Sequence, residues 1–380
     1  MSEAAGGFAA ELAALDLSAL AARALEATDS DVDRVLAAQQ LGPADVAVLL
    51  SPAAAARLEE IAQAAKEQTT QRFGRAVRLF APLYLSNACL STCTYCGFAK
   101  DLDVVRRTLT VAEVTAESAV LVQRGFRHLL LVSGEHRTEV SADYLIDVVR
   151  ALDPDVVSVS IETQTWSDDT YARLVAAGVE GVVHYQETYD RARYADVHRA
   201  GWKRDFDRRL AAVERAAASG VRRLGVGALL GLAPDWRADV IAVASHAAWL
   251  SRHFWRTDVT VALPRIKPSA SGFQPVVEIS DADYVQAMAA LRLGAPDAGI
   301  VLSTREPAAL RDGLVRIAVT SMSAGSSTEP GGYSHPGESQ QQFSISDDRT
   351  PAQIAAMLAA AGYEPVWKDA FSLRPEPVRF

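Results

Sequence analysis

Cysteine is scarce in this chain of 380 residues, which has only three. All three lie in one short stretch, Cys89-Leu-Ser-Thr-Cys-Thr-Tyr-Cys96. No cysteine is left over to pair, so the composition is typical of a protein of the reducing cytoplasm. A structural zinc site and an electron-transferring iron–sulfur cluster usually take four ligands, and this chain has no fourth cysteine to give.

Positive charge and long apolar segments are also lacking. The formal net charge at pH 7 is -9, which argues against general nucleic-acid binding and leaves an acidic protein partner open. No apolar run approaches the roughly 20 residues that span a bilayer. The segment Met1–Phe8 has neither the basic nor the apolar region of a signal peptide. We therefore expect a cytoplasmic protein that binds neither nucleic acid nor a membrane.

The chain divides into three parts by its sequence pattern. Residues 1–75 are rich in Ala, Leu, Glu and Arg with helical periodicity, and Pro43 and Pro52 stand where helices begin. We expect a helical extension there, outside the main domain of residues 76–330. Residues 331–380 are expected to form a tail that packs on this domain, with a helix over 348–361 and an extended segment at 365–367.

In the main domain, short β-branched runs alternate with longer helical patterns. The candidate strands are Val77–Ser86, Arg127–Ser133, Asp155–Glu162, Gly181–Gln186, Arg223–Leu229, Asp258–Pro264, Gly299–Ser303 and Arg316–Thr320. Eight strand-then-helix units predict an α/β fold, a parallel (β/α)8 barrel of the TIM type. A doubly wound open sheet is the alternative, and the lack of a Gly-rich dinucleotide loop disfavours it.

The spacing of the cysteines indicates what they bind. Thiolates in the pattern C-x3-C-x2-C can hold three irons of a [4Fe-4S] cluster, and Cys89, Cys93 and Cys96 are the predicted ligands. The fourth iron then has no protein ligand, and we expect it to bind the amino and carboxylate groups of S-adenosylmethionine (AdoMet). Tyr95 can shield the cluster and lie near the adenine, or simply pack the loop.

Polar residues follow the second candidate strand, at the end of the barrel where active sites lie. Gly134 permits close backbone approach, and the Glu135 carboxylate can accept hydrogen bonds from the AdoMet ammonium group. His136 comes next. Its sequence position is equally compatible with a general base and with a supporting hydrogen-bonding role.

Other strand ends supply further candidates. Glu187 can bind the AdoMet ribose hydroxyls. Arg209 can pair with the AdoMet carboxylate, although it belongs to a charged run that is equally typical of a surface. Arg305 and Ser323, near the ends of the last two strands, can hold a substrate carboxylate, because a guanidinium group matches a carboxylate bidentately.

Four stretches of the chain resemble the radical-AdoMet aromatic amino-acid lyases. They are Pro82-Leu-Tyr-Leu-Ser-Asn-Ala-Cys89 through Cys96-Gly-Phe-Ala99, Leu129-Leu-Leu-Val-Ser-Gly-Glu-His136, Tyr185-Gln-Glu-Thr-Tyr189 and Leu302-Ser-Thr-Arg-Glu-Pro307. The resemblance runs from about residue 75 to the C-terminus and is greatest to the tyrosine lyases of bacterial thiamine biosynthesis.

This resemblance implies a reaction, a substrate and partners. AdoMet would be cleaved to methionine and a 5'-deoxyadenosyl radical, which removes a hydrogen from the amino group of L-tyrosine. The Cα–Cβ bond would then break to give 2-iminoacetate (dehydroglycine) and 4-cresol. The resemblance also implies that Arg305 and Ser323 anchor the tyrosine carboxylate. The implied partners are a thiazole synthase and a flavodoxin or ferredoxin that delivers the electron.

Three alternatives remain open. The first is the relative that matures [FeFe]-hydrogenase, which carries a second cysteine motif near its C-terminus. This chain has no cysteine after Cys96, which argues against that role. Tryptophan-cleaving relatives typically differ in the cysteine loop from the Tyr95-Cys-Gly-Phe98 found here. The alternative of another class is a non-catalytic iron–sulfur protein or a zinc-stabilised binding protein. His136 and Tyr189 are the candidates for contact with the substrate phenol.

Overall fold

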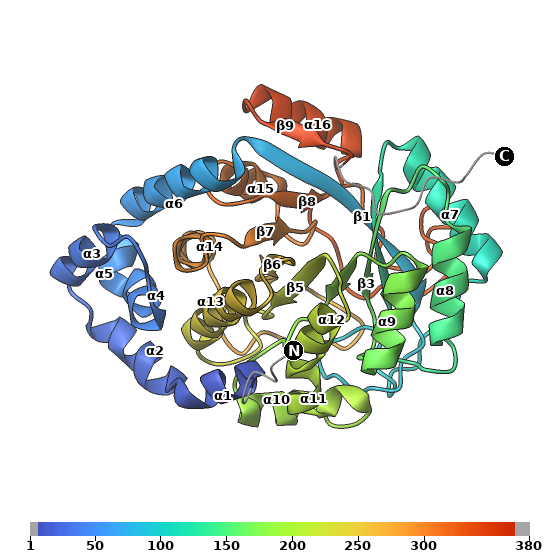
Figure 1. Ribbon diagram of the computed structural model, residues 1–380, viewed down its shortest axis with the longest axis horizontal. Coiled ribbons are helices and arrows are strands. Elements are labelled where there is room, and N and C mark those ends of the chain that lie inside the picture. Colours follow the sequence, from blue (N-terminus) through green and yellow to red (C-terminus); the bar gives the residue numbers. More distant parts are fainter. Residues whose placement is uncertain (1–6, 369–380) are drawn as a thin grey trace.

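The computed structural model describes residues 7–368, and its centre is a barrel of parallel strands surrounded by helices (Figure 1). The strands follow one another in the order β2-β3-β4-β5-β6-β7-β8-β1, and pairing of β1 with β2 closes the barrel. Their bounds are β1 (Ala76–Ser86), β2 (His128–Ser133), β3 (Ser158–Glu162), β4 (Gly181–Val183), β5 (Arg223–Gly227), β6 (Asp258–Ala262), β7 (Gly299–Leu302) and β8 (Ser321–Ser323). The prediction of a TIM-type barrel is therefore confirmed.

Helices follow the strands and cover the outside of the barrel. They are α7 (Val111–Gln123), α8 (Ala142–Ala151), α9 (Asp168–Ala177), α10 (Arg191–Val197), α11 (Phe206–Leu210), α12 (Ala212–Ala218), α13 (Trp236–His253), α14 (Asp281–Gly294) and α15 (Ala308–Val315). Thr110, Ser141 and Ser280 cap α7, α8 and α14 by accepting a backbone N–H of the first turn. Such a cap typically contributes about 1 kcal/mol to helix stability.

The eighth strand was predicted in the wrong place. Residues 316–320 form the turn that ends α15, where the N–H groups of Ile317 and Ala318 donate to the Leu314 carbonyl, both at 3.0 Å. Their apolar side chains pack against the core, which explains why the run resembles a strand. The strand itself is β8, so Ser323 lies within it rather than after it.

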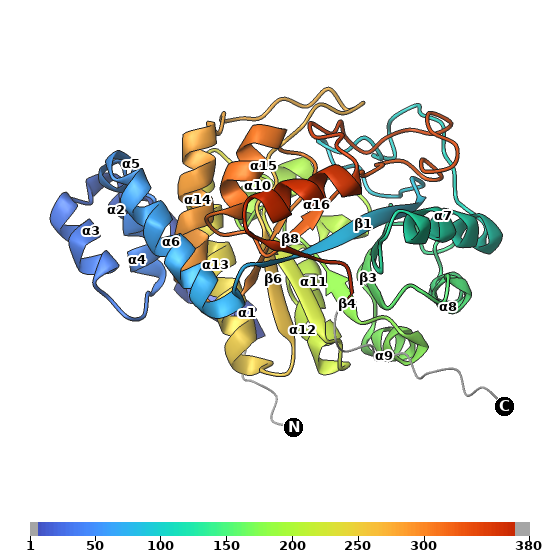
Figure 2. The same cartoon turned by 90° about the horizontal axis from the view of Figure 1, so that it is seen from above.

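The N-terminal helices pack on one side of the barrel, against α13 and α14 (Figure 2). They are α1 (Gly7–Ala14), α2 (Leu17–Glu26), α3 (Asp29–Leu36), α4 (Pro43–Leu49), α5 (Pro52–Ala56) and α6 (Leu58–Phe73). Phe8 of α1 is fully buried and stacks on the His246 ring of α13, with ring centres 4.0 Å apart. On the same His246 ring, Nδ1 lies 2.8 Å from the Tyr189 hydroxyl.

The C-terminal segment returns to the barrel and extends its sheet. After α16 (Pro351–Ala360), strand β9 (Glu364–Val366) pairs in parallel with the first residues of β1, from Ala76 to Arg78. Before α16, the Asp347 carboxylate forms a fully buried ion pair with Arg311 of α15. Residues 369–380 of the predicted tail lie outside the described part of the chain. None of the described helices is both long and apolar enough to cross a lipid bilayer.

The contact of Phe8 with His246 predicts that α1 is part of the cooperative fold. Phe8→Ala should lower the free energy of unfolding by about 3 kcal/mol, because it leaves a cavity under α1. Urea unfolding followed by circular dichroism measures this change. Leu25→Ala in α2 is the control, since Leu25 is 60% exposed and a change within about 0.5 kcal/mol is expected there. Equal effects of the two substitutions would contradict the prediction.

Candidate active site

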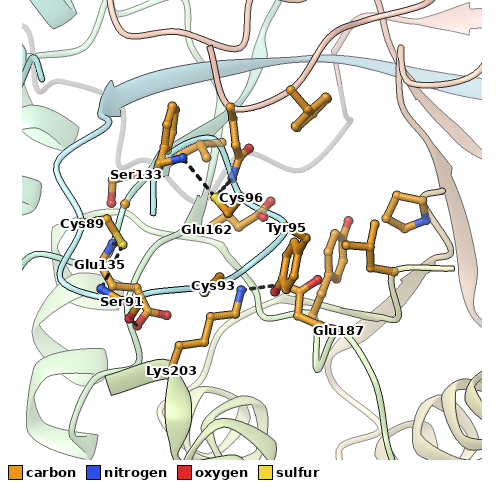
Figure 3. A pocket seen from close by; sticks show the side chains of 18 of the residues that line it. Cys89, Ser91, Cys93, Tyr95, Cys96, Ser133, Glu135, Glu162, Glu187 and Lys203 are labelled. Atoms are coloured by element: carbon orange, nitrogen blue, oxygen red, sulfur yellow. Dashed lines mark hydrogen bonds and ion pairs between the residues drawn. The ribbon is translucent and has the colours of Figure 1, made fainter. Parts of the chain in front are cut away.

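The three cysteines line one cavity at the carboxyl ends of the barrel strands (Figure 3). Most of the candidate residues identified in the sequence line the same cavity. They are Tyr95, Gly134, Glu135, Glu187, Arg209 and Arg305. The barrel thus brings together residues that are more than 200 positions apart in the chain.

Cys93 is buried, Cys89 and Cys96 are partly buried, and the sulfurs of the latter two accept hydrogen bonds from the backbone. Cys89 Sγ lies 3.4 Å from the backbone N–H groups of both Ser91 and Glu135, and Cys96 Sγ lies 3.4 Å from that of Phe98. Burial raises the pKa of Cys89 to about 11 and that of Cys93 well above its usual value. Thiolates in so dry a cavity need metal cations to stabilise them. Buried cysteines with N–H donors around their sulfurs fit an iron–sulfur cluster.

A second segment of backbone holds the cysteine loop in place. Thr94 N–H donates to the Val197 carbonyl (3.0 Å), and Thr92 N–H donates to that of Ala200 (3.3 Å). A β-bridge joins Cys93 to His198. The His198 ring in turn lies 2.8 Å from the Tyr95 hydroxyl. The hydrogen bond to His198 therefore holds the Tyr95 side chain in place, and Tyr95 also lines the cavity.

Four charged side chains form a chain of ion pairs beside the cysteines; three are buried, and the fourth, Lys203, is mostly covered. Arg209 Nη1 lies 3.0 Å from Glu135 Oε1, and Arg209 Nη2 lies 3.8 Å from Glu187 Oε1. The same Glu187 oxygen lies 2.6 Å from Lys203 Nζ. Burial alone would raise the pKa of Glu187, but the adjacent Lys203 and Arg209 cations lower it below its ordinary value. The two cations thus hold the Glu187 carboxylate in its charged form.

The structure decides between the two interpretations of Arg209 and adds one residue to the site. Arg209 is only 6% exposed, so its interpretation as a surface charge is wrong. Lys203 was not identified from the sequence at all. It lies in a short 3-10 turn, Trp202–Arg204, which has no motif that would point to a cavity.

The backbone at Glu187 is strained, and its neighbours hold it. Its φ of 72° is the one positive value for a non-glycine residue within the described range, a conformation that typically costs about 1–3 kcal/mol. Asp239 Oδ1 of α13 accepts hydrogen bonds from Tyr189 N–H (2.7 Å) and from the Thr188 hydroxyl (3.1 Å). These bonds fix the turn that directs the Glu187 carboxylate into the cavity.

Gly134 lies where the backbone must come close to the cysteine loop. A Cβ atom on Gly134 would lie 2.3 Å from the Ala88 carbonyl oxygen and 3.0 Å from Cys89 Cβ. Only glycine fits this position. The glycine lets the end of β2 meet the loop directly, and this contact brings Glu135 N–H to the Cys89 sulfur.

A second, inner pocket adjoins the cysteine cavity and contains Ser323. The two pockets share Glu162, Tyr185, Arg305 and Phe343 as lining residues. Ser323 Oγ accepts a hydrogen bond from Thr304 N–H at 3.2 Å. The predicted pair, Arg305 and Ser323, therefore lines one pocket, and Arg305 also faces the cysteines.

The C-terminal segment, expected from the sequence to pack on the barrel, lines both pockets through Gln342 and Phe343. The Arg305 guanidinium carbon lies 3.3 Å from the centre of the Phe343 ring. Next to it, Gln342 accepts a hydrogen bond from the Tyr84 hydroxyl (2.7 Å), and its amide nitrogen lies 3.9 Å from Cys96 Sγ. Gly97 N–H donates to the Gln342 carbonyl at 3.2 Å. The tail is therefore part of the site.

Two predicted residues are not brought to the site. His136 is absent from the lining of both pockets, and its Nδ1 accepts a hydrogen bond from Glu139 N–H at 3.2 Å. Tyr189 is also absent from the lining of both pockets, and its hydroxyl forms a hydrogen bond with His246, the residue on which Phe8 of α1 stacks. Neither side chain is placed to contact a substrate phenol in these pockets.

Glu162 was noted in the sequence only as a strand end, and the structure places it in the wall that the two pockets share. Burial and the negative charge of Glu187 raise its pKa from 4.5 to about 7. The folded protein then holds a proton that the unfolded chain releases above pH 4.5. Stability is therefore lost as the pH rises toward 7.

Glu162→Gln should remove this loss. The shift corresponds to roughly 3 kcal/mol, so the variant should be more stable than the parent at pH 8 by that order, with the difference vanishing near pH 4.5. Urea unfolding of the iron-free protein between pH 5 and pH 8 measures it. Glu139→Gln, in the exposed loop after β2, is the control. Parallel pH profiles of the parent and the Glu162→Gln variant would contradict the assignment.

Comparison with known proteins places this site in a family. Residues 83–243 match the family described as Radical SAM superfamily, in which SAM denotes AdoMet, and residues 262–364 match the Biotin and Thiamin Synthesis associated domain. A crystal structure of HydG, a maturase of the [FeFe]-hydrogenase, superposes with a TM-score of 0.86 and 30% identity, covering 93% of this chain and 80% of that one.

Curated relatives are more similar in sequence. The 2-iminoacetate synthase of Escherichia coli (strain K12) is 44% identical over 342 residues, which cover 90% of this chain and 91% of that protein. The 2-iminoacetate synthase of Salmonella typhimurium is 42% identical over the same shares of both chains. The chain therefore belongs to the 2-iminoacetate synthase family of radical-AdoMet enzymes.

Proposed function

We propose that this protein is a carbon–carbon lyase that cleaves L-tyrosine at the Cα–Cβ bond, giving 2-iminoacetate and 4-cresol, for assembly of the thiamine thiazole. One observation carries the proposal. A cysteine cavity suited to a [4Fe-4S] cluster shares a wall, including Arg305, with a pocket that holds Ser323. Radical generation and substrate anchoring would thus occur in adjoining spaces.

Cys89, Cys93 and Cys96 would hold the cluster, and Glu135, Glu187 and Arg209 would hold AdoMet. The bound cluster and AdoMet supply a 5'-deoxyadenosyl radical and methionine. The Glu135 carboxylate would accept a hydrogen bond from the AdoMet ammonium group, and Arg209 would pair with the AdoMet carboxylate. Both residues line the cysteine cavity, where they form an ion pair with each other. Glu187 would accept from the ribose hydroxyls. Tyr95 would flank the adenine. Gly134 allows the end of β2 to lie close against the cysteine loop.

The substrate carboxylate would be anchored by Arg305 and Ser323. Phe343 covers one face of the Arg305 guanidinium group. Stacking on that face leaves the N–H edge free for the two carboxylate oxygens. Anchoring at this wall presents the amino group toward the cysteine cavity. A reactive radical attacks the hydrogen that is nearest, so positioning decides the product.

A product assay tests this function. Cluster-reconstituted protein, given AdoMet, dithionite and L-tyrosine without oxygen, should form 5'-deoxyadenosine and 4-cresol, detected by mass spectrometry. L-Tryptophan should give no cleavage product. Turnover of tryptophan in place of tyrosine would assign the protein to the tryptophan-cleaving enzymes. Formation of 5'-deoxyadenosine with neither amino acid cleaved would refute the substrate.

Phe343→Leu should weaken the anchoring of tyrosine through Arg305. Leucine fills similar space but offers no flat face, so we expect KM for tyrosine to rise about tenfold, equivalent to about 1.4 kcal/mol. In D2O, abstraction from the exchanged amino group puts deuterium into 5'-deoxyadenosine, and abstraction from carbon puts protium there. A loosely anchored tyrosine presents its C–H bonds to the radical more often, so the protium fraction in 5'-deoxyadenosine should rise in the variant. Phe343→Tyr, which keeps the ring, should behave as the parent. Unchanged KM and labelling in Phe343→Leu would disprove this role.

Two partners fit this function. The imine product hydrolyses in water, which favours transfer to a thiazole synthase. The radical step consumes an electron, which a flavodoxin or ferredoxin would deliver. A reducing cytoplasm suits three free thiols and a reduced cluster.

A further inference from the structure

An exposed aromatic side chain is held between two guanidinium groups on the outside of the cysteine loop. Trp202 is 41% exposed. The guanidinium carbons of Arg137 and Arg208 lie 3.9 Å and 4.3 Å from its ring centre. Arg199 and Arg204, in the same segment as Trp202, are also exposed. We call Arg137, Arg199, Trp202, Arg204 and Arg208 the arginine–tryptophan face.

This face directly adjoins the cysteine cavity. A Cβ atom on Gly201 would lie 2.5 Å from the Cα atom of Ser91, so the turn packs tightly on the loop between Cys89 and Cys93. Lys203, two positions after Gly201, points inward and lines the cavity beside Cys93 (Figure 3). One short turn therefore has the cluster-binding loop on its inner side and the exposed Trp202 on its outer side.

The charge of this segment is opposite to that of the whole protein. The net charge of the chain is -9, whereas residues 199–208 contain three Arg and two Asp besides Lys203, which is paired with Glu187 in the cavity. Both of those Asp side chains are engaged, since Asp205 caps α11 and Asp207 pairs with Arg191. Tryptophan and arginine are the residues most enriched in interface hot spots. A basic face on an acidic protein favours an acidic partner.

We propose that the arginine–tryptophan face is the docking site of an acidic one-electron donor protein, a flavodoxin or ferredoxin. The proposal rests on the proposed function, because only cleavage of AdoMet requires an electron from outside. The reduced cofactor of the donor loses one electron and the cluster gains it. Docking against the outside of the cysteine loop gives the electron a short path. A thiazole synthase would have no need of this proximity.

The test compares two reductants on the cluster-loaded enzyme. Arg199→Glu/Arg204→Glu reverses two exposed charges that make no contact with the cavity. With reduced flavodoxin, the rate of 5'-deoxyadenosine formation should fall about tenfold, and its dependence on salt should weaken. With dithionite, the rate should stay within about twofold of the parent, because a small reductant needs no docking. Trp202→Ala should behave in the same way.

The chain offers a matched control at the other end of the barrel. Trp255 is 76% exposed, and the Arg256 guanidinium carbon lies 4.8 Å from its ring centre, in the connection from α13 to β6. Trp255→Ala/Arg256→Glu should leave flavodoxin-driven turnover unchanged. A charge-reversed face that loses no more flavodoxin-driven activity than this control would overturn the proposal.

Other outcomes are equally decisive. If the charge-reversed variant formed 5'-deoxyadenosine equally slowly with dithionite, docking would be refuted, because the substitutions would then have disturbed the cluster itself. Loss of thiazole synthase binding with flavodoxin-driven turnover intact would assign the face to that partner. Failure of the unaltered enzyme with both reductants would contradict the proposed function instead.

Discussion

The ion pairs that join Glu135, Arg209, Glu187 and Lys203 hold the site together. Two carboxylates and two cations balance, so the cavity tolerates their burial before any ligand binds. The four residues come from the loops after β2 and β4, from the turn Trp202–Arg204 and from α11. Their pairing therefore fixes the position of several loops relative to the cysteines. An incoming zwitterion such as AdoMet would meet charges already oriented for its own, which reduces the cost of ordering the site.

The second requirement is closure. A radical and a hydrolysable imine both demand a site from which water is excluded. The structure achieves closure with a distant part of the chain, because Gln342 and Phe343 cover the pockets that the barrel leaves open. The buried ion pair of Asp347 with Arg311 anchors this segment, and Arg311 also donates to the Ser323 carbonyl. The stability of the tail and the shape of the substrate pocket are thus coupled.

Much of the barrel and the cysteine site could be predicted from sequence because their signals are local. The spacing of the three cysteines and the alternation of strands and helices do not depend on distant contacts. The tail was expected to pack on the barrel, but its contacts with the site could not be predicted, since Gln342 and Phe343 meet Cys96 and Arg305 only after folding. Lys203 shows the same limit, because a lysine in a short turn looks like a surface charge. The eighth strand was misplaced because the apolar turn after α15 packs into the core as a strand would.

The central claim is that three cysteines bind the cluster and leave one iron open to AdoMet. Mössbauer spectroscopy of the 57Fe-reconstituted protein, with and without AdoMet, tests it most directly. The account predicts that one iron of the four changes its signal when AdoMet is added, while the other three keep the signature of thiolate ligation. Four equivalent irons that do not respond to AdoMet would contradict the account.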